Sequence, residues 1–260
     1  MLEVRNLTKV YADGTVALRE VSFTVPPGEF LVIIGLSGSG KSTLLRCINR
    51  LIDPTEGQIL WDGVDITAAP REKLREIRRQ IGMVFQQFNL INRASVLTNV
   101  LTGRLGYVRP RSSLFYQFPA RDRELAWKAL ERVGITDQAR KQARELSGGQ
   151  QQRVGIARAL VQQPRMLLAD EPVASLDPVL AHSILGSLEQ LNQEDGITVL
   201  CSLHYLDLVQ RYATNVIGLR AGRLVYRGSR EDIRTMSDEQ FKEIYGEEAV
   251  RVSAGRTEKG

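Results

Sequence analysis

A glycine-rich string, Gly35–Thr43 (GLSGSGKST), most constrains what this chain can fold into. It follows an apolar run over residues 30–34 that predicts a buried strand, and it precedes an apolar stretch, 44–48, that predicts the first turns of a helix. The glycines let the backbone turn so that successive amides and the helix N-terminus face one point, which forms a cradle for phosphate oxygens. The string therefore predicts a P-loop.

The residue types in this loop suit a nucleotide triphosphate bound with Mg²⁺. Lys41 is expected to reach the β- and γ-phosphates and Ser42 to bind Mg²⁺, whereas Leu36 stands where only a backbone amide is needed. A glycine-rich turn with no ligand is the plain alternative, and the complete G-x-x-x-x-G-K-S string argues against it. The residues predicted to bind ATP here are Gly35, Leu36, Ser37, Gly38, Ser39, Gly40, Lys41, Ser42 and Thr43.

The chain has 260 residues and 43% apolar content, enough to bury a sizeable core as one large domain or a domain with a subdomain. Its apolar runs are far shorter than the roughly 20 residues needed to cross a bilayer, and its N-terminus lacks a signal pattern. We therefore expect a cytosolic protein. Cys47 and Cys201 lie in apolar stretches without metal-ligand spacing, which predicts two buried, reduced thiols.

The net charge is +5 and the pI is near 9.3. Lys and Arg are scattered among 30 acidic residues instead of forming a block, so we expect no nucleic-acid partner. A basic surface that lies near anionic lipid headgroups or carries nucleotide is compatible with the same charge.

The N-terminal part of the chain contains short strand patterns. Residues 2–7 and 16–25 alternate as half-exposed strands do, and a strand predicted over 58–61 leads into an Asp62-Gly63 hairpin turn. Tyr11 stands between the first two segments. On the residues alone, an aromatic just before a turn is more often a packing residue than one that stacks on a base.

Residues 81–85 predict a further buried strand, which ends at Gln86. A glutamine at the carboxyl end of a core strand faces the ligand crevice of such a sheet, where its amide can hold a metal-bound water. The densely charged residues 71–80 carry Leu74 and Ile77 at helical spacing and predict a helix with a solvated face.

From residue 89 to about 163 the periodicity becomes helical, which predicts an inserted helical subdomain. Its residues 104–123 mix arginines with aromatics over more length than a connection needs. Two interpretations stay open for this basic-aromatic stretch: a loop and helix packed on its own subdomain, or a docking surface for a membrane partner. Its arginines and aromatics are Arg104, Tyr107, Arg109, Arg111, Phe115, Tyr116, Phe118, Arg121 and Arg123.

A second place for an anion is predicted at Leu146–Gln150. Ser147 is an N-cap residue followed by Gly148 and Gly149 at the start of a periodic helix, so bare amides and a helix dipole meet there. One nucleotide needs only one P-loop. The second anion site therefore implies a second ligand, or it completes the site of another copy.

Residues 165–171 predict a buried strand that ends in two adjacent acids, Asp170 and Glu171. Burying carboxylates is costly unless a positive charge offsets them, and Mg²⁺ beside a triphosphate would do so. Because side chains alternate along a strand, we expect Asp170 to serve the Mg²⁺ shell and Glu171 to reach a water in line with the γ-phosphate. The alternative is a strand that leaves the core at Pro172.

His204 follows a buried strand predicted over residues 196–203. It is expected on the same crevice rim as Gln86 and Glu171, close enough to donate to a phosphate oxygen.

The remaining segments are predicted to be structural. Asp177 precedes a helix over 182–192 and can be its N-cap alone. His182 is expected on the exposed side of that helix. A hairpin over 216–226 closes the fold, and residues 251–260 are expected to be disordered.

Taken in this order, the motifs resemble those of ABC-transporter ATP-binding subunits, and the resemblance covers essentially the whole chain. It implies that Tyr11 stacks on adenine, which reverses the packing interpretation. It also implies that Gln86 contacts Mg²⁺ and the attacking water, that Glu171 is the catalytic base and that His204 is the switch histidine. The implied metal ligands are Ser42, Gln86 and, through water, Asp170. The residues implied to bind ATP held on the opposite subunit are Ser147, Gly148, Gly149, Gln150 and Asp177.

The resemblance implies an α/β fold with a P-loop NTPase, RecA-like core, a mostly parallel sheet, an N-terminal antiparallel β subdomain and an inserted helical subdomain. One ATP-binding domain would span residues 1–248. The core and β subdomain would occupy 1–88 and 164–248, the helical subdomain 89–163, and a disordered tail 249–260.

A narrower likeness, carried by residues 85–93, 99–106, 174–178 and 203–207, is to the ATPases of phosphonate importers. It implies a subunit that uses ATP and Mg²⁺ to power import of phosphonate, or phosphite in close relatives. The implied partners are a second copy, integral membrane permease subunits and, indirectly, a periplasmic solute-binding protein. The implied location is the cytoplasmic face of the inner membrane. An importer of another small solute, such as a polar amino acid, is the alternative.

Three other classes of protein are less compatible with the sequence. Soluble ABC proteins of DNA repair or translation usually carry tandem cassettes or long coiled-coil inserts, which are absent here. A small-molecule kinase would not need a second anion-binding helix start. A nucleotide-gated scaffold that no longer hydrolyses ATP is disfavoured because Glu171 and His204 are both present.

Overall fold

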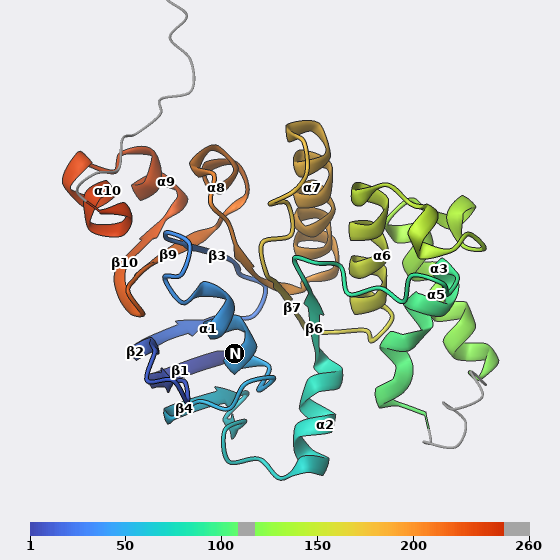
Figure 1. The fold of residues 1–260 in the computed structure, drawn as a ribbon, viewed down its shortest axis with the longest axis horizontal. Helices are drawn as coiled ribbons and strands as arrows, with labels where there is room; N and C mark the ends of the chain where they lie inside the picture. The colour runs from blue at the N-terminus through green and yellow to red at the C-terminus, as the bar shows by residue number, and fades with distance from the viewer. Residues whose placement is uncertain (109–117, 247–260) are drawn as a thin grey trace, which may run out of the picture.

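The computed structural model describes residues 1–108 and 118–246 (Figure 1). The predicted C-terminal tail lies outside the described residues. The same holds for Arg109, Arg111, Phe115 and Tyr116 of the basic-aromatic stretch.

A six-stranded sheet forms the centre of the molecule (Figure 1). Its strand order is β10-β9-β3-β8-β7-β6, and every neighbouring pair is parallel except β9 with β10, which forms the predicted closing hairpin at one edge. Its strands are β3 (Phe30–Ile34), β6 (Ile81–Val84), β7 (Met166–Ala169), β8 (Thr198–Ser202), β9 (Asn215–Arg220) and β10 (Arg223–Ser229).

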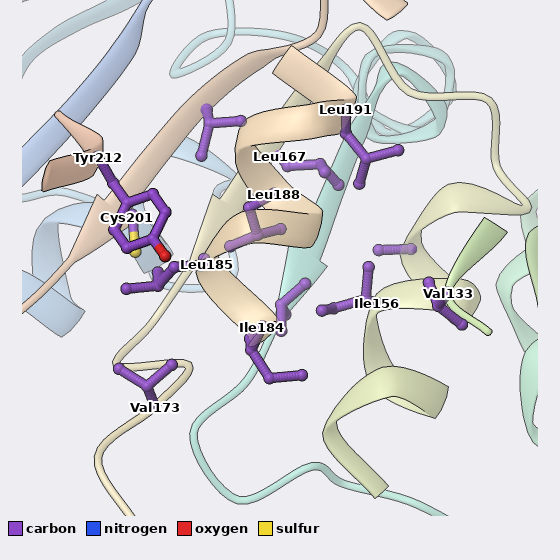
Figure 2. Close-up of a cluster of buried hydrophobic side chains, with 14 of the residues drawn as sticks. Val133, Ile156, Leu167, Val173, Ile184, Leu185, Leu188, Leu191, Cys201 and Tyr212 are labelled. Atoms are coloured by element: carbon purple, nitrogen blue, oxygen red, sulfur yellow. The ribbon is translucent and has the colours of Figure 1, made fainter. Parts of the chain in front are cut away.

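This sheet is buried on both faces, which is why its strands read as continuous apolar runs. Side chains alternate between two cores: Phe30 and Val32 of β3 belong to one, and Leu31 and Ile33 to the other. Figure 2 shows part of the first core, which gathers around the helix that begins at Pro178.

The second core lies between the central sheet and an antiparallel sheet of order β2-β1-β4-β5. This sheet joins β4 to β5 through Asp62 and Gly63, both left-handed with φ of 49° and 80°, which confirms the predicted hairpin turn. Its strands are β1 (Leu2–Val10), β2 (Val16–Val25), β4 (Glu56–Trp61) and β5 (Val64–Asp65).

Helices cover the central sheet, and a group of helices lies beside one of its edges (Figure 1). The P-loop leads into α1 (Lys41–Ile48), and α2 (Arg71–Gln80) precedes β6. The segment after β6 is helical, as predicted: α3 (Val96–Leu101), α5 (Ala120–Arg132) and α6 (Gly148–Leu160) pack together, joined by short 3₁₀ turns η1 (Thr102–Gly106), η2 (Thr136–Gln138) and η3 (Ala143–Glu145). The remaining helices are α7 (Pro178–Asp195), α8 (Leu206–Tyr212), α9 (Arg230–Arg234) and α10 (Asp238–Tyr245).

Several predicted bounds were wrong, among them the strands predicted over 165–171 and 196–203, which are shorter in the structure. The helix predicted over 182–192 begins at Pro178, directly after its N-cap Asp177, because proline is tolerated in a first helical turn. The strand predicted over 2–7 continues to Val10, where it still pairs with β2.

Arg104, Tyr107 and Phe118 of the basic-aromatic stretch pack within the chain, whereas Arg121 and Arg123 are exposed. Arg104 is buried and donates to Asp122 Oδ1 at 2.9 Å and to the carbonyl of Val161. Its guanidinium stacks on the Tyr107 ring, 3.6 Å from the centroid, and Phe118 belongs to the first core. For these residues the packing interpretation is the better one.

Candidate functional site

The carboxyl ends of β3, β6, β7 and β8 meet at one edge of the sheet, and the predicted functional side chains follow them. The P-loop follows β3, Gln86 follows β6, the two acids follow β7 and His204 follows β8. A cavity of about 260 Å³ opens there. It is lined by Ala17, Ser37, Gly38, Gly40, Lys41, Ser42, Thr43, Gln86 and Glu171.

The P-loop has the backbone that its glycines predicted. Gly35, Gly38 and Gly40 have φ of 142°, 76° and 107°, a region that other residues rarely adopt. Gly40 is the N-cap of α1 and offers no side-chain cap, so the first amides of the helix have no intrahelical acceptor. These amides and the helix dipole make the end of α1 an anion site.

Lys41 lies at the bottom of this loop and is 3% exposed. Its ammonium donates to the carbonyls of Gly35 and Leu36, both at 2.9 Å, and lies 3.8 Å from the Glu171 carboxylate. Burial lowers the pKa of Lys41, and the carboxylates of Glu171 and Asp170 oppose that change. The buried ammonium of Lys41 can thus bind an anionic ligand.

Asp170 is 1% exposed and accepts hydrogen bonds from side chains of α1 and β8. Ser42 Oγ of α1 donates to its Oδ1 at 2.7 Å, and Ser202 Oγ of β8 donates to the same oxygen at 3.4 Å. Arg46 of α1 lies 3.4 Å from Oδ2, and its own side chain is 44% exposed. A hydroxyl and a carboxylate this close are ligands of the kind that Mg²⁺ prefers.

Glu171 lies one step beyond Asp170 and contacts His204. Its carboxylate meets Nε2 of His204 at 2.5 Å, and its amide donates to Ser202 Oγ at 2.8 Å. We predicted that strand alternation would point the two acids in different directions, and this was wrong, because β7 ends at Ala169, before either acid. Glu171 has φ of 47°, so a left-handed turn, not strand alternation, separates the two side chains.

Gln86 lines the cavity, two residues past the end of β6. The loop that follows it contains Phe88 and Asn89, both left-handed with φ of 52° and 50°. Arg158 of α6 holds their carbonyls, donating to that of Phe88 at 2.7 Å and to that of Asn89 at 2.6 Å. Burial lowers the pKa of this arginine. The Gln86 loop is therefore bound to the helix that carries the second predicted anion site.

Tyr11 lies beside the P-loop helix. Its hydroxyl is 3.2 Å from Thr43 Oγ1, and Lys9 Nζ lies 5.4 Å from its ring centroid. The ring is half-buried, and its hydroxyl contacts a residue that lines the cavity, although Tyr11 itself does not line it.

Ser147 and Asp177 are both N-caps, as predicted. Ser147 Oγ accepts from the Gln150 amide and the Gln150 side chain accepts from the Ser147 amide, which makes a capping box at the start of α6. Asp177 Oδ1 accepts from the Leu180 amide. Neither residue lines the cavity, and in Figure 1 α6 and α1 lie on opposite sides of β7.

Gly148 and Gly149 place no side chain on the first turn of α6. Gly148 is exposed, whereas Gly149 packs under Leu180 of α7, whose Cδ1 would be 3.0 Å from an added Cβ.

Sequence reasoning missed three residues of this site: Arg46, Arg158 and Ser202. Each contacts a segment that is distant in sequence, so only the tertiary structure reveals its partner. Ser202 alone had a local signal, because a serine ending a buried apolar strand needs a partner.

Two features are absent from the described residues. No helix there is long and apolar enough to span a bilayer. No cluster of three or more His, Cys, Asp or Glu side chains forms a metal-binding group in the same residues. His182 is exposed, as predicted, and its Nδ1 lies 3.0 Å from the Tyr212 hydroxyl. The two cysteines are buried, as predicted.

Known proteins resemble this chain along most of its length. The family described as ABC transporter matches residues 18–174. Phosphonates import ATP-binding protein PhnC of Shouchella clausii is 51% identical over 246 residues, which are 95% of this chain and 91% of that protein. The protein of the same name from Bacillus thuringiensis subsp. konkukian is 51% identical over 251 residues, 96% of each chain.

Solved structures agree with these relatives. The dimeric structure of MJ0796, a bacterial ABC transporter cassette, matches with a TM-score of 0.79 and 36% identity, covering 88% of this chain and 99% of that one. The ADP conformation of MJ1267, an ATP-binding cassette of an ABC transporter, matches with a TM-score of 0.81 and 32% identity, covering 94% and 97%.

Proposed function

Because this chain belongs to the ABC transporter family, we propose that it is the ATP-hydrolysing subunit of an importer for phosphonate or a related reduced phosphorus anion such as phosphite. The observation that carries the catalytic part is the cavity in which a buried lysine, a P-loop and the Glu171 carboxylate face one another. The names of the relatives that are 51% identical over nearly the whole chain support the solute.

In this proposal the P-loop amides and Lys41 hold the phosphates of ATP and offset the charge that develops on the transferred phosphoryl group. Lys41 would exchange its two carbonyl acceptors for phosphate oxygens. Glu171 orients the attacking water and accepts its proton. His204, in contact with the Glu171 carboxylate, holds that carboxylate toward the cavity.

The residues around Asp170 suit Mg²⁺. Asp170 is a buried carboxylate whose one ion-pair partner in the described part of the chain is the half-exposed Arg46, and Ser42 offers an adjacent hydroxyl. Ser42, Gln86 and, through water, Asp170 would hold the ion, and Ser42 and Gln86 both line the cavity. When bound, Mg²⁺ would neutralise charge on the β- and γ-phosphates.

Two copies are needed in this proposal. Ser147, Gly148, Gly149 and Gln150 form a helix start that lies away from the chain's own cavity, with Ser147 and Gly148 exposed. These residues would contact ATP on a second copy, with Asp177 near the same face. The dimeric structure of MJ0796 supports this arrangement. Closure would depend on contacts to the γ-phosphate, and hydrolysis would remove them.

The remaining partners follow from the same proposal. The dimer would act at the cytoplasmic face of the inner membrane, bound to permease subunits that receive solute from a periplasmic binding protein. Tyr11 would stack on the adenine ring.

Glu171→Gln tests the catalytic assignment. The variant should bind ATP, lose turnover and accumulate as a closed dimer, which size-exclusion chromatography with ATP would detect. Wild-type turnover in this variant would contradict the role of Glu171.

The solute needs a separate test. ATPase activity of the complex reconstituted with its permease and binding protein should rise with a phosphonate or phosphite. Stimulation by a polar amino acid instead would contradict the proposed solute and leave the catalytic assignment intact.

A further inference from the structure

Ser202 is a fully buried polar residue at the last position of β8, and the functions above give it no role. Its hydroxyl has two partners. The oxygen accepts from the Glu171 amide at 2.8 Å, and the hydrogen points to Asp170 Oδ1 at 3.4 Å. One side chain therefore contacts both acids of the site.

The place of Ser202 in the sheet explains these contacts. The ladder between β7 and β8 ends at the pair Ala169 and Cys201. Beyond it the Glu171 backbone turns left-handed, and its amide bonds to a hydroxyl instead of to a strand. Ser202 points to the same face of the sheet as Leu200, which belongs to the second core, so its hydroxyl lies on the Asp170 side of the sheet.

The end of β8 thus holds Glu171 at two points. Ser202 holds the amide, and His204, two residues later, holds the carboxylate. A left-handed residue that is not glycine keeps its conformation only when its surroundings fix it. With the His204 contact alone, the Glu171 side chain could pivot.

We infer that Ser202 is a positioning residue for ATP hydrolysis, which fixes the left-handed Glu171 peptide so that the carboxylate points at the attacking water. The inference rests on the proposed role of Glu171. Ser202 acts through that residue and does not touch the nucleotide, so it should affect kcat and leave the KM for ATP nearly unchanged.

Ser202→Ala tests this inference in the full-length protein. Loss of an orienting partner one residue removed from the chemistry typically costs roughly 10- to 100-fold, and we expect that loss in kcat. Ser202→Thr keeps the hydroxyl and should recover most of the activity. Ser202→Cys fills the same volume but offers only a weak acceptor, so it should show the same loss of kcat and takes the place of the alanine variant if that variant does not fold.

Thr198→Val is the matched control. Thr198 lies on the same strand and the same face, is also buried, and its hydroxyl accepts from the Gly28 amide at 2.9 Å, at the end of β8 far from the site. It should lower the melting temperature about as much as Ser202→Ala and keep wild-type kcat. Equal kcat in the two variants would overturn the inference.

A double variant separates this inference from the proposed function. In a Glu171→Gln background, Ser202→Ala should cause no further loss of the residual turnover, because the group that it positions is gone. A further loss as large as that in the wild-type background would overturn the positioning role. Wild-type turnover in Glu171→Gln alone would contradict the role of Glu171 itself.

Discussion

At the scale of single residues, Asp170 sets the electrostatics of the site. Its carboxylate is buried, and its oxygens are held by two hydroxyls and by Arg46, the one basic side chain that the structure places in hydrogen-bond contact with it within the described ranges. A buried charge needs such donors. Arg46 is half exposed, so it can leave when a metal ion takes over its role.

Arg46→Gln should therefore destabilise the metal-free protein and matter less with Mg²⁺ and ADP bound. A partly exposed pair is worth at most about 1 kcal/mol, or roughly 2–4 °C in melting temperature for a chain of this size. Thermal unfolding in chelator and in Mg²⁺ with ADP would measure both effects. Arg165→Gln is the control, since its exposed pair with Asp62 lies at the other end of the sheet. An equal loss in both conditions for Arg46→Gln would contradict the role given to it.

The two cysteines should be unreactive in the folded protein. Burial raises the pKa of the Cys47 thiol to about 11, and burial also raises the pKa of Cys201. Since the thiolate is the reactive form, little of either is present at about pH 8. Titration with a thiol reagent should detect no fast-reacting cysteine in native protein and both after denaturation. Fast labelling of the native protein would show that one of them is accessible.

Local sequence patterns could predict those residues whose role depends only on their own segment. The P-loop glycines and the caps Ser147 and Asp177 lie where the sequence predicted, and the two acids directly follow β7. The partners of Ser202 were not predictable, because they directly follow β7, and only the order of parallel strands makes β7 and β8 neighbours. The left-handed turn at Glu171 was hidden as well, since glutamate gives no signal for positive φ.

At the scale of elements, α6 packs so closely against η1 that the contact requires a glycine in η1. A Cβ on Gly103 of η1 would lie 2.2 Å from the Arg158 carbonyl oxygen and 2.6 Å from Val161 Cγ1. This contact and the Arg158 bonds to the Gln86 loop tie η1, α6 and that loop into one unit. Such close approaches come from tertiary packing, so the helical periodicity predicted α6 without predicting what it touches.

Gly103→Ala should therefore destabilise the protein by about 1–3 kcal/mol, the usual cost of overpacking. Gly155→Ala is the matched control within α6, because nothing lies within 4 Å of its added Cβ. That variant should stabilise by up to about 1 kcal/mol, since alanine is the better helix former. Urea unfolding would measure both changes. Equal destabilisation in the two variants would contradict the packing described for η1.

At the scale of the whole molecule, the chain has two anion-binding helix starts that face different directions. The start of α1 opens into its own cavity, whereas the start of α6 is exposed on the other side of β7 (Figure 1). The strand order causes this separation, because β8 and β7 lie between β3, which leads into α1, and β6, which leads into the helical segment. A single copy cannot bring both starts to one phosphate without rearranging its central sheet.

Cross-linking should detect the pairing of these two starts between copies. Ser37 in the P-loop and Ser147 are both exposed, and both native cysteines are buried, so Ser37→Cys with Ser147→Cys adds the accessible thiols of the described residues. In a Glu171→Gln background, a short thiol cross-linker should give a covalent dimer when ATP is present. Little dimer should form without ATP or with either cysteine substitution alone, because each P-loop would meet the α6 start of the other copy. A product of monomer size linked within one chain would contradict the head-to-tail arrangement, since it would show that one copy can bring its own two helix starts together.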